Sequence, residues 1–178
     1  MPTEYAGVRN GTEQQLPPPA ELLRAFREPD DPNRHRHGVL SAARELVECH
    51  ERRNTAIDAA HAPDAPAGRV AACSLLVEDI DGYRAELVGR IDTWVADNVE
   101  HRGGASLHTE TLGAVIDRLA AKWIAAQRAL RRTPQQRTHP VQVDGEAHLQ
   151  WCRLAELTDG YRDLITDVIE HRRRLPVW

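Results

Sequence analysis

Apolar side chains recur at steps of three and four residues along several stretches of this chain. The most regular stretch spans residues 69–99, where the stripe consists of Val70, Cys73, Val77, Ile80, Arg84, Leu87, Ile91, Trp94 and Asn98. Steps of three and four place side chains on one face of an α-helix. The pattern therefore predicts a long amphipathic helix with one buried face.

Three other stretches show the same spacing. They cover residues 38–61, a segment that starts near 109–111 and ends near 130, and a segment from about 146 to 175 that ends before Pro176. Prolines and a glycine in residues 61–68 separate the first two long helices, and turn signals in residues 131–145 predict a long loop before the fourth. The helices should therefore form two antiparallel hairpins.

The N-terminal region has weaker signals. Residues 1–19 are rich in polar residues and proline, which predicts a flexible tail, because such a segment buries too little apolar surface to offset its ordering entropy. Residues 20–28 favour a short helix that packs as an appendage. The expected fold is all-α: an elongated antiparallel bundle of four long helices in one domain, residues 20–178, with this short helix at its start.

Two helical segments resemble each other. Residues 76–84 read LVEDIDGYR and residues 154–162 read LAELTDGYR. A duplicated helical hairpin would explain the likeness and would bring the two D-G-Y-R segments near each other. Chance similarity between helices of similar composition is the alternative.

Composition and charge narrow the possible functions. The formal net charge of −4 argues against general binding to nucleic acid, which relies on an excess of basic residues. No export signal and no apolar run of about 18 residues occurs, and the three cysteines form no C-x-x-C pair, so we expect a cytoplasmic protein without a membrane span. Arginine almost completely replaces lysine, which is typical of a genome of high GC content.

One sequence string suggests a family. Residues 107–119 read LHTETLGAVIDRL, which resembles the "TETPGSIIDRL"-like signature of a bacterial family known as domain of unknown function 4254. Residues 83–94 and 157–169 resemble two further segments of that family, so the likeness covers about residues 38–175. The chain departs from the pattern at Leu112, where proline is usual, and at Tyr83 and Ala85, where Gln and Asn are usual. The resemblance implies a helical fold and little about function.

Several polar residues occupy positions of interest. Some lie on helix faces that should form the apolar core, and others lie at the start of the third long helix. Arg84 interrupts the apolar stripe, and a buried, unpaired guanidinium would cost several kcal/mol, so we expect a carboxylate partner or a polar cavity. The candidate ligand-binding residues are Arg84, Glu110, Asp117, Arg118, Arg162 and His50. A purely structural ion-pair network that fixes helix register is the alternative for all of them.

A metal-dependent reaction is a second hypothesis. Glu48 and Glu51 on one helix and Glu78 and Asp81 on the next imitate the paired carboxylates with which all-α nucleoside triphosphate pyrophosphohydrolases hold Mg²⁺. In a chain with 28% charged residues such pairs also arise as a solvated face. The sequence does not decide whether the protein is an enzyme.

Two classes of function thus stay open. The first is a helical module, without a cofactor, whose polar seam binds a small anionic ligand or a protein partner, with a homodimer among the options. The second is the Mg²⁺-dependent hydrolase. Pyrophosphate release from nucleoside triphosphates and Mg²⁺ would distinguish them. Within the first class, the structure should show whether the polar side chains converge on a cavity or only satisfy one another.

Overall fold

The fold consists mainly of helices. The computed structural model describes residues 15–28, 37–131 and 140–177, and for residues 140–144 it describes the backbone alone. Its elements are α1 (Pro19–Arg27), α2 (Gly38–Ala60), α3 (Ala67–Asn98), β1 (Ser106–Leu107), α4 (Leu112–Arg131), α5 (Pro140–Ile169) and β2 (Arg173–Arg174). The all-α fold class and the short N-terminal helix are confirmed.

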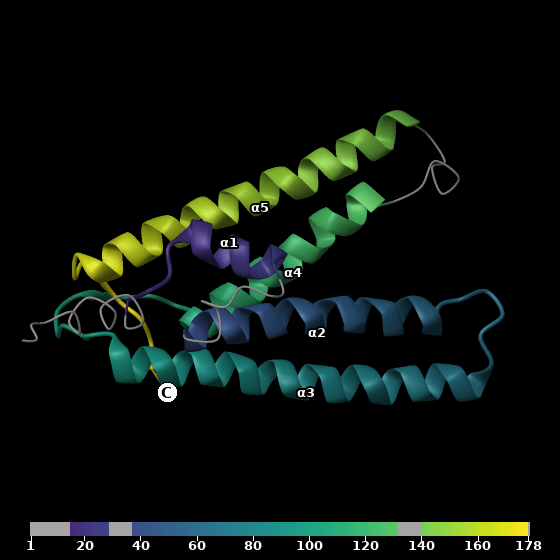
Figure 1. The fold of residues 1–178 in the computed structure, drawn as a ribbon, viewed down its shortest axis with the longest axis horizontal. Coiled ribbons are helices and arrows are strands. Elements are labelled where there is room, and N and C mark those ends of the chain that lie inside the picture. Colours follow the sequence, from purple (N-terminus) through teal and green to yellow (C-terminus); the bar gives the residue numbers. More distant parts are fainter. Residues whose placement is uncertain (1–14, 29–36, 132–139, 178) are drawn as a thin grey trace, which may run out of the picture.

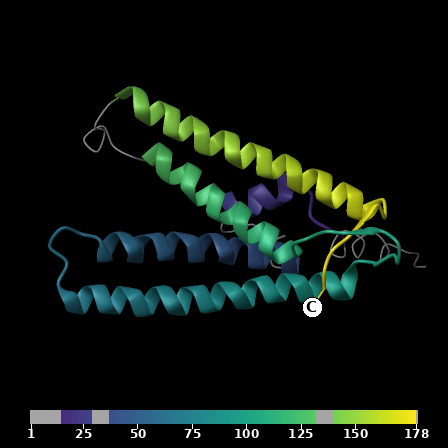
Figure 2. The same ribbon diagram turned by 180° about the vertical axis from the view of Figure 1, so that it is seen from behind.

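The four long helices form two antiparallel hairpins, α2–α3 and α4–α5 (Figures 1 and 2). Helix α4 packs against both α2 and α3, whereas the main contacts of α5 are with α4, α1 and β2. The two hairpins run obliquely and diverge toward the ends where each hairpin turns (Figure 1). The elongated antiparallel four-helix bundle expected from the sequence is therefore not confirmed, although the fold is mostly helical.

The apolar stripe of α3 is buried over only part of its length. Ile80, Leu87, Ile91 and Val95 are at most 2% exposed, because α2 and α4 cover this part of the helix. Val70, near the start of α3, is 38% exposed. The regular spacing correctly predicted the helix but overestimated how much of its face is buried.

Helix α1 belongs to the hydrophobic core, so its expected position as an appendage is wrong. Leu22, Ala25 and Phe26 are at most 2% exposed, and the ring of Phe26 lies 6.1 Å from that of Trp123 on α4. Figures 1 and 2 show α1 next to α5, between the two hairpins. The apolar face of a nine-residue helix thus fills the space that the diverging hairpins leave.

The predicted tail is partly ordered against this core. Residues 1–14 lie outside the described residues, but Leu16 is 7% exposed, and the backbone oxygen of Pro17 accepts a hydrogen bond from the buried hydroxyl of Tyr161. His37 is also buried: its Nδ1 accepts from the backbone N–H of Val39 at the start of α2, and its Nε2 donates to the backbone oxygen of Gln15. Residues 15–18 are thus attached at two points.

Helix α5 differs from the expectation at both ends. It begins at Pro140, within the predicted loop, and residues 132–139 lie outside the described residues. It ends at Ile169, before Pro176, and the chain continues into β2. β2 pairs with β1 in parallel, Ser106 opposite Arg173, and so joins the segment before α4 to the C-terminal segment. None of the described helices has the length and apolarity needed to cross a membrane.

Candidate functional site

Five charged or polar side chains from three helices form a partly buried ion-pair network, which we call the interior network and define as His50, Arg53, Asp81, Arg84 and Asp117. Arg84 on α3 holds Asp117 on α4 with two hydrogen bonds, Nη2 to Oδ2 at 2.8 Å and Nε to Oδ1 at 3.2 Å. Nε2 of His50 on α2 lies 2.8 Å from Oδ1 of Asp117. Arg84 also contacts Asp81 at 2.6 Å, and Asp81 accepts from Nε of Arg53 at 2.9 Å.

The network keeps its carboxylates charged. Burial alone would raise the pKa of Asp117, but the hydrogen bonds from His50 and Arg84 outweigh it and lower this pKa to about 2. Desolvation opposes ionisation of Asp81 as well, and its hydrogen bonds with Arg53 and Arg84 still lower the pKa of this carboxyl. The hydrogen bond to Asp117 raises the pKa of Arg84. Each charge is therefore stabilised by an opposite charge within the protein.

The expectation that Arg84 needs a carboxylate partner is confirmed. Its partners are Asp117 and Asp81, and the Arg84 side chain is 23% exposed. Three of its five N–H groups already bind two carboxylates, and these carboxylates neutralise its charge, which weakens any attraction for an anionic ligand. The geometry thus supports the structural alternative for His50, Arg84 and Asp117: the network connects α2, α3 and α4 and fixes how they lie relative to one another.

The residues at the start of α4 have structural roles of a different kind. The Thr111 hydroxyl accepts a hydrogen bond from the backbone N–H of Ala114, 3.2 Å away, and so caps the helix. Oδ1 of Asp92 on α3 accepts from the backbone N–H of Gly113 at 2.8 Å. A Cβ atom at Gly113 would lie 2.5 Å from the backbone oxygen of Val88. Only glycine allows α3 and α4 to approach this closely.

Glu110 and Arg118 are separate from the interior network. Their side chains form a forked ion pair on the surface, with distances of 2.9 Å from Nη1 to Oε1 and 2.6 Å from Nη2 to Oε2. The Arg118 side chain is 47% exposed and the Glu110 side chain is 40% exposed. Neither satisfies a buried charge, and an exposed ion pair of this kind contributes little to stability.

Arg118 borders a cavity of about 170 Å³ between α4 and α5, which we call the α4–α5 cavity. It is lined by His108, Val115, Arg118, Leu119, Glu156, Leu157, Gly160, Tyr161 and Leu164. Most of these residues are apolar and form the floor of the cavity. His108, Arg118 and Glu156 supply its polar groups.

Local contacts position two of the three polar side chains of the α4–α5 cavity, those of His108 and Arg118. Nδ1 of His108 lies 2.8 Å from the backbone oxygen of Glu110 and 3.3 Å from its backbone nitrogen, which orients the ring. Nε2 of His108 has no hydrogen-bond partner among the described residues. Glu156 likewise forms no ion pair with any residue that the structure describes. Arg118 uses two N–H groups on Glu110 and keeps three others.

Arg162 joins neither the interior network nor the α4–α5 cavity. It is exposed and pairs with Asp159 at 2.6 Å, just as Arg84 pairs with Asp81 at the same distance in the other D-G-Y-R segment. The two segments share this local ion pair but differ in environment, because Tyr161 is buried whereas Tyr83 is exposed and bonds Glu45. The structure therefore separates Arg162 from the other candidate residues.

The four carboxylates of the proposed magnesium site do not converge. Glu48, Glu51 and Glu78 are exposed, Glu48 pairs with Arg44, and Asp81 is engaged by two arginines. Across residues 15–28, 37–131 and 140–177, no three side chains of His, Cys, Asp or Glu come together in a way that could hold a metal ion. This arrangement gives the hydrolase hypothesis no support.

Sequence reasoning missed several residues of these sites. His108 directly precedes the T-E-T string, and its hydrogen bonds with the backbone of Glu110 were not foreseen. Glu156 lies in the second repeat segment, but its position at a cavity depends on how α4 and α5 pack, which periodicity does not show. Asp81 was considered only as a metal ligand, although it lies three residues before Arg84 on the same helix face.

Comparison with known proteins agrees with the family resemblance. No curated protein and no solved structure matches the chain. A family described as protein of unknown function (DUF4254) matches residues 40–177, which cover α2 to the C-terminal segment. The match includes the interior network, the start of α4 and the α4–α5 cavity. The chain therefore belongs to the DUF4254 family.

Proposed function

We propose that this protein binds a small zwitterionic ligand with an apolar side group, of the amino-acid class, in the α4–α5 cavity. The observation that carries the proposal is the position of Arg118, which is held by Glu110 and borders a cavity with an apolar floor. The proposal retains Glu110 and Arg118 from the candidate site and assigns His50, Arg84 and Asp117 to the structural network.

The polar groups suit a ligand that carries both charges. The three N–H donors left on Arg118 can bind a carboxylate. When Nδ1 of His108 donates to the backbone oxygen of Glu110, Nε2 is an acceptor and suits an ammonium group. Glu156 can pair with an ammonium group. A ligand with only a carboxylate would also face the negative charges of Glu110 and Glu156, and a ligand with only an amine would face Arg118. A zwitterion avoids both repulsions.

The apolar floor and the size of the cavity limit the rest of the ligand. Val115, Leu119 and Leu164 are at most 6% exposed and can pack against an aliphatic or aromatic side group. The volume of about 170 Å³ is below the range of roughly 300–1,000 Å³ for pockets that hold drug-sized molecules. Leucine and phenylalanine are therefore suitable probes.

Titration calorimetry with matched probes tests this proposal. Leucine is compared with 4-methylpentanoate, which lacks the amine, with 3-methylbutylamine, which lacks the carboxylate, and with glycine, which lacks the apolar group. We expect leucine or phenylalanine to bind, and every matched compound to bind at least tenfold more weakly. Absence of binding by both amino acids at 10 mM, or equal affinity for 4-methylpentanoate, would contradict the proposal.

A variant pair locates the ammonium contact. Glu156→Gln should weaken leucine binding about tenfold, because it removes the counter-charge of the ammonium group. It should leave the weak binding of 4-methylpentanoate unchanged or improved. Glu86→Gln is the matched control, since Glu86 is exposed on α3 and does not line the α4–α5 cavity. Equal losses in both variants would argue against a direct contact.

A further inference from the structure

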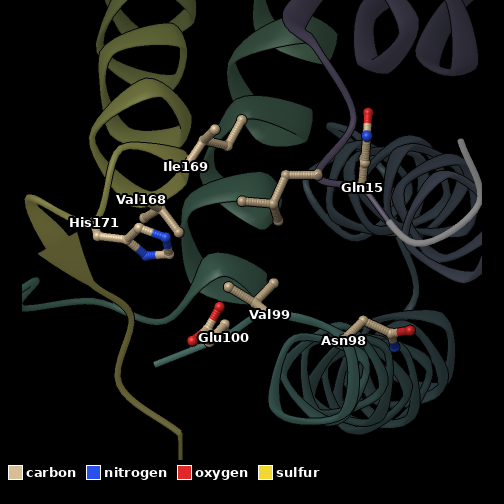
Figure 3. Close-up of a pocket in the computed structure, with 8 residues that line it drawn as sticks. Gln15, Asn98, Val99, Glu100, Val168, Ile169 and His171 are labelled. Atoms are coloured by element: carbon tan, nitrogen blue, oxygen red, sulfur yellow. The ribbon is translucent and has the colours of Figure 1, made fainter. Parts of the chain in front are cut away.

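A second cavity lies at the C-terminal end of α5. It has a volume of about 270 Å³ and is lined by Gln15, Leu16, Asn98, Val99, Glu100, Val168, Ile169 and His171. We call it the terminal cavity, because the N-terminal segment, the end of α3 and the end of α5 meet there (Figure 3). Leu16 and Val168 are at most 7% exposed and form its apolar floor.

His171, two residues after the end of α5, has an unusual backbone conformation. His171 has φ of 57°, and it is the one non-glycine residue with positive φ among the described residues. The N–H of His171 donates to the oxygen of Val168 and that of Arg172 to the oxygen of Asp167, which is the Schellman pattern of helix termination. Glycine is the usual residue at this position, because it adopts positive φ without strain. A histidine here lowers stability, which calls for a benefit elsewhere.

The position of the imidazole suggests that benefit. Figure 3 shows the His171 side chain on the cavity side of α5, facing Val99 and Glu100 at the end of α3. His171 and Glu100 have no side-chain hydrogen bond or ion pair with any residue of the described ranges, so both can bind a ligand. Glu100 places a carboxylate beside the apolar floor.

We propose that the terminal cavity binds a small apolar amine, with the ammonium group between Glu100 and His171 and the hydrocarbon part against Leu16, Val99 and Val168. Carboxylate and neutral imidazole both accept hydrogen bonds from an ammonium group. The apolar floor accepts an alkyl chain. The site shares no lining residue with the α4–α5 cavity, so this proposal is independent of the proposed function.

The test uses thermal unfolding of the full-length protein at pH 8 with hexylamine, hexanoate and hexanol. A ligand that binds only the folded protein raises Tm in a concentration-dependent way. We expect hexylamine to raise Tm, hexanol to raise it less, and hexanoate to have no effect. Glu100→Gln should reduce the hexylamine effect to that of hexanol. Equal effects of hexylamine and hexanoate on the wild type, or an unchanged hexylamine effect in Glu100→Gln, would overturn the proposal.

A His171→Gly variant separates binding from helix termination. Relief of the positive φ should raise Tm in the absence of ligand by about 2–4 °C. The same variant should lose most of the hexylamine effect, because one acceptor of the ammonium group is removed. A higher Tm with an unchanged hexylamine effect would show that His171 does not contribute to binding.

Discussion

Asp117 is a largely buried carboxylate that stays charged because it has two partners on other helices. Its side chain is 18% exposed, His50 and Arg84 hold its oxygens, and its pKa is lowered to about 2. The need of Arg84 for a carboxylate could be predicted from its place in an apolar stripe. That the partner is Asp117 and not Glu110 could not be predicted. Glu110 precedes α4, so the direction of its side chain depends on the local backbone geometry.

The first prediction concerns acid stability. A pKa that is lower in the folded protein means that ionised Asp117 stabilises the fold above the usual aspartate pKa of about 4, and that this contribution is lost as the pH falls toward 2. The shift corresponds to about 2 kcal/mol. The free energy of unfolding, measured with urea from pH 6 to pH 2, should therefore differ between wild type and Asp117→Asn by an amount that shrinks below pH 4. A constant difference across this range would contradict the account.

At the scale of elements, α4 is positioned by its first turn. Gly113 lies against the backbone of Val88, Asp92 accepts its N–H, and Thr111 caps the helix. The T-E-T to D-R-L string thus combines structural residues with a surface ion pair. The resemblance to the family gave no way to separate the two groups, since a string of residues does not show which backbone approaches which.

The second prediction tests this close approach. Alanine usually stabilises a helix relative to glycine by about 0.5–1 kcal/mol. At Gly113 the new Cβ would lie 2.5 Å from the oxygen of Val88, so Gly113→Ala should destabilise the protein by about 2 kcal/mol or more. Gly82→Ala on α3 is the control, because nothing lies within 4 Å of its Cβ, and it should be neutral or stabilising. Similar unfolding free energies for both variants would argue against the close contact.

The helix boundaries show which elements could be predicted from the sequence pattern and which could not. The ranges of α1, α2 and α3 follow from apolar spacing and prolines and agree with the structure within a few residues. The start of α5 was missed because Pro140 was treated as a turn signal, although proline also fits the first turn of a helix. The pairing of β1 with β2 involves two residues on each strand, which is too short for any periodic signal.

At the scale of the whole molecule, two hairpins diverge and α1 fills the space between them (Figure 1). The hairpins could be predicted, but their relative orientation could not, because it depends on α1 and on segments outside the repeating stripes. Phe26, which is 1% exposed, lies against Trp123, and Trp123 in turn contacts Trp151 on α5. Helix α1 therefore connects to both helices of the α4–α5 hairpin.

The third prediction concerns this role of α1. Phe26→Ala should lower the free energy of unfolding by about 3–5 kcal/mol, as expected for truncation of a fully buried aromatic residue. Leu75→Ala is the control, since Leu75 is 63% exposed on α3 and should change stability by less than about 0.5 kcal/mol. Urea denaturation of both variants provides the comparison. A small effect of Phe26→Ala would indicate that α1 is an appendage after all.

The most direct test of the account compares Asp117→Asn with Arg118→Gln, because these neighbours on α4 are assigned to different tasks. Asp117→Asn should lower Tm by about 5–10 °C through loss of a buried ion pair and leave the affinity for leucine within about twofold of wild type at 15 °C. Arg118→Gln should change Tm by less than about 2 °C, since its pair with Glu110 is exposed, and weaken leucine binding at least tenfold. Unchanged leucine affinity in Arg118→Gln would contradict the account.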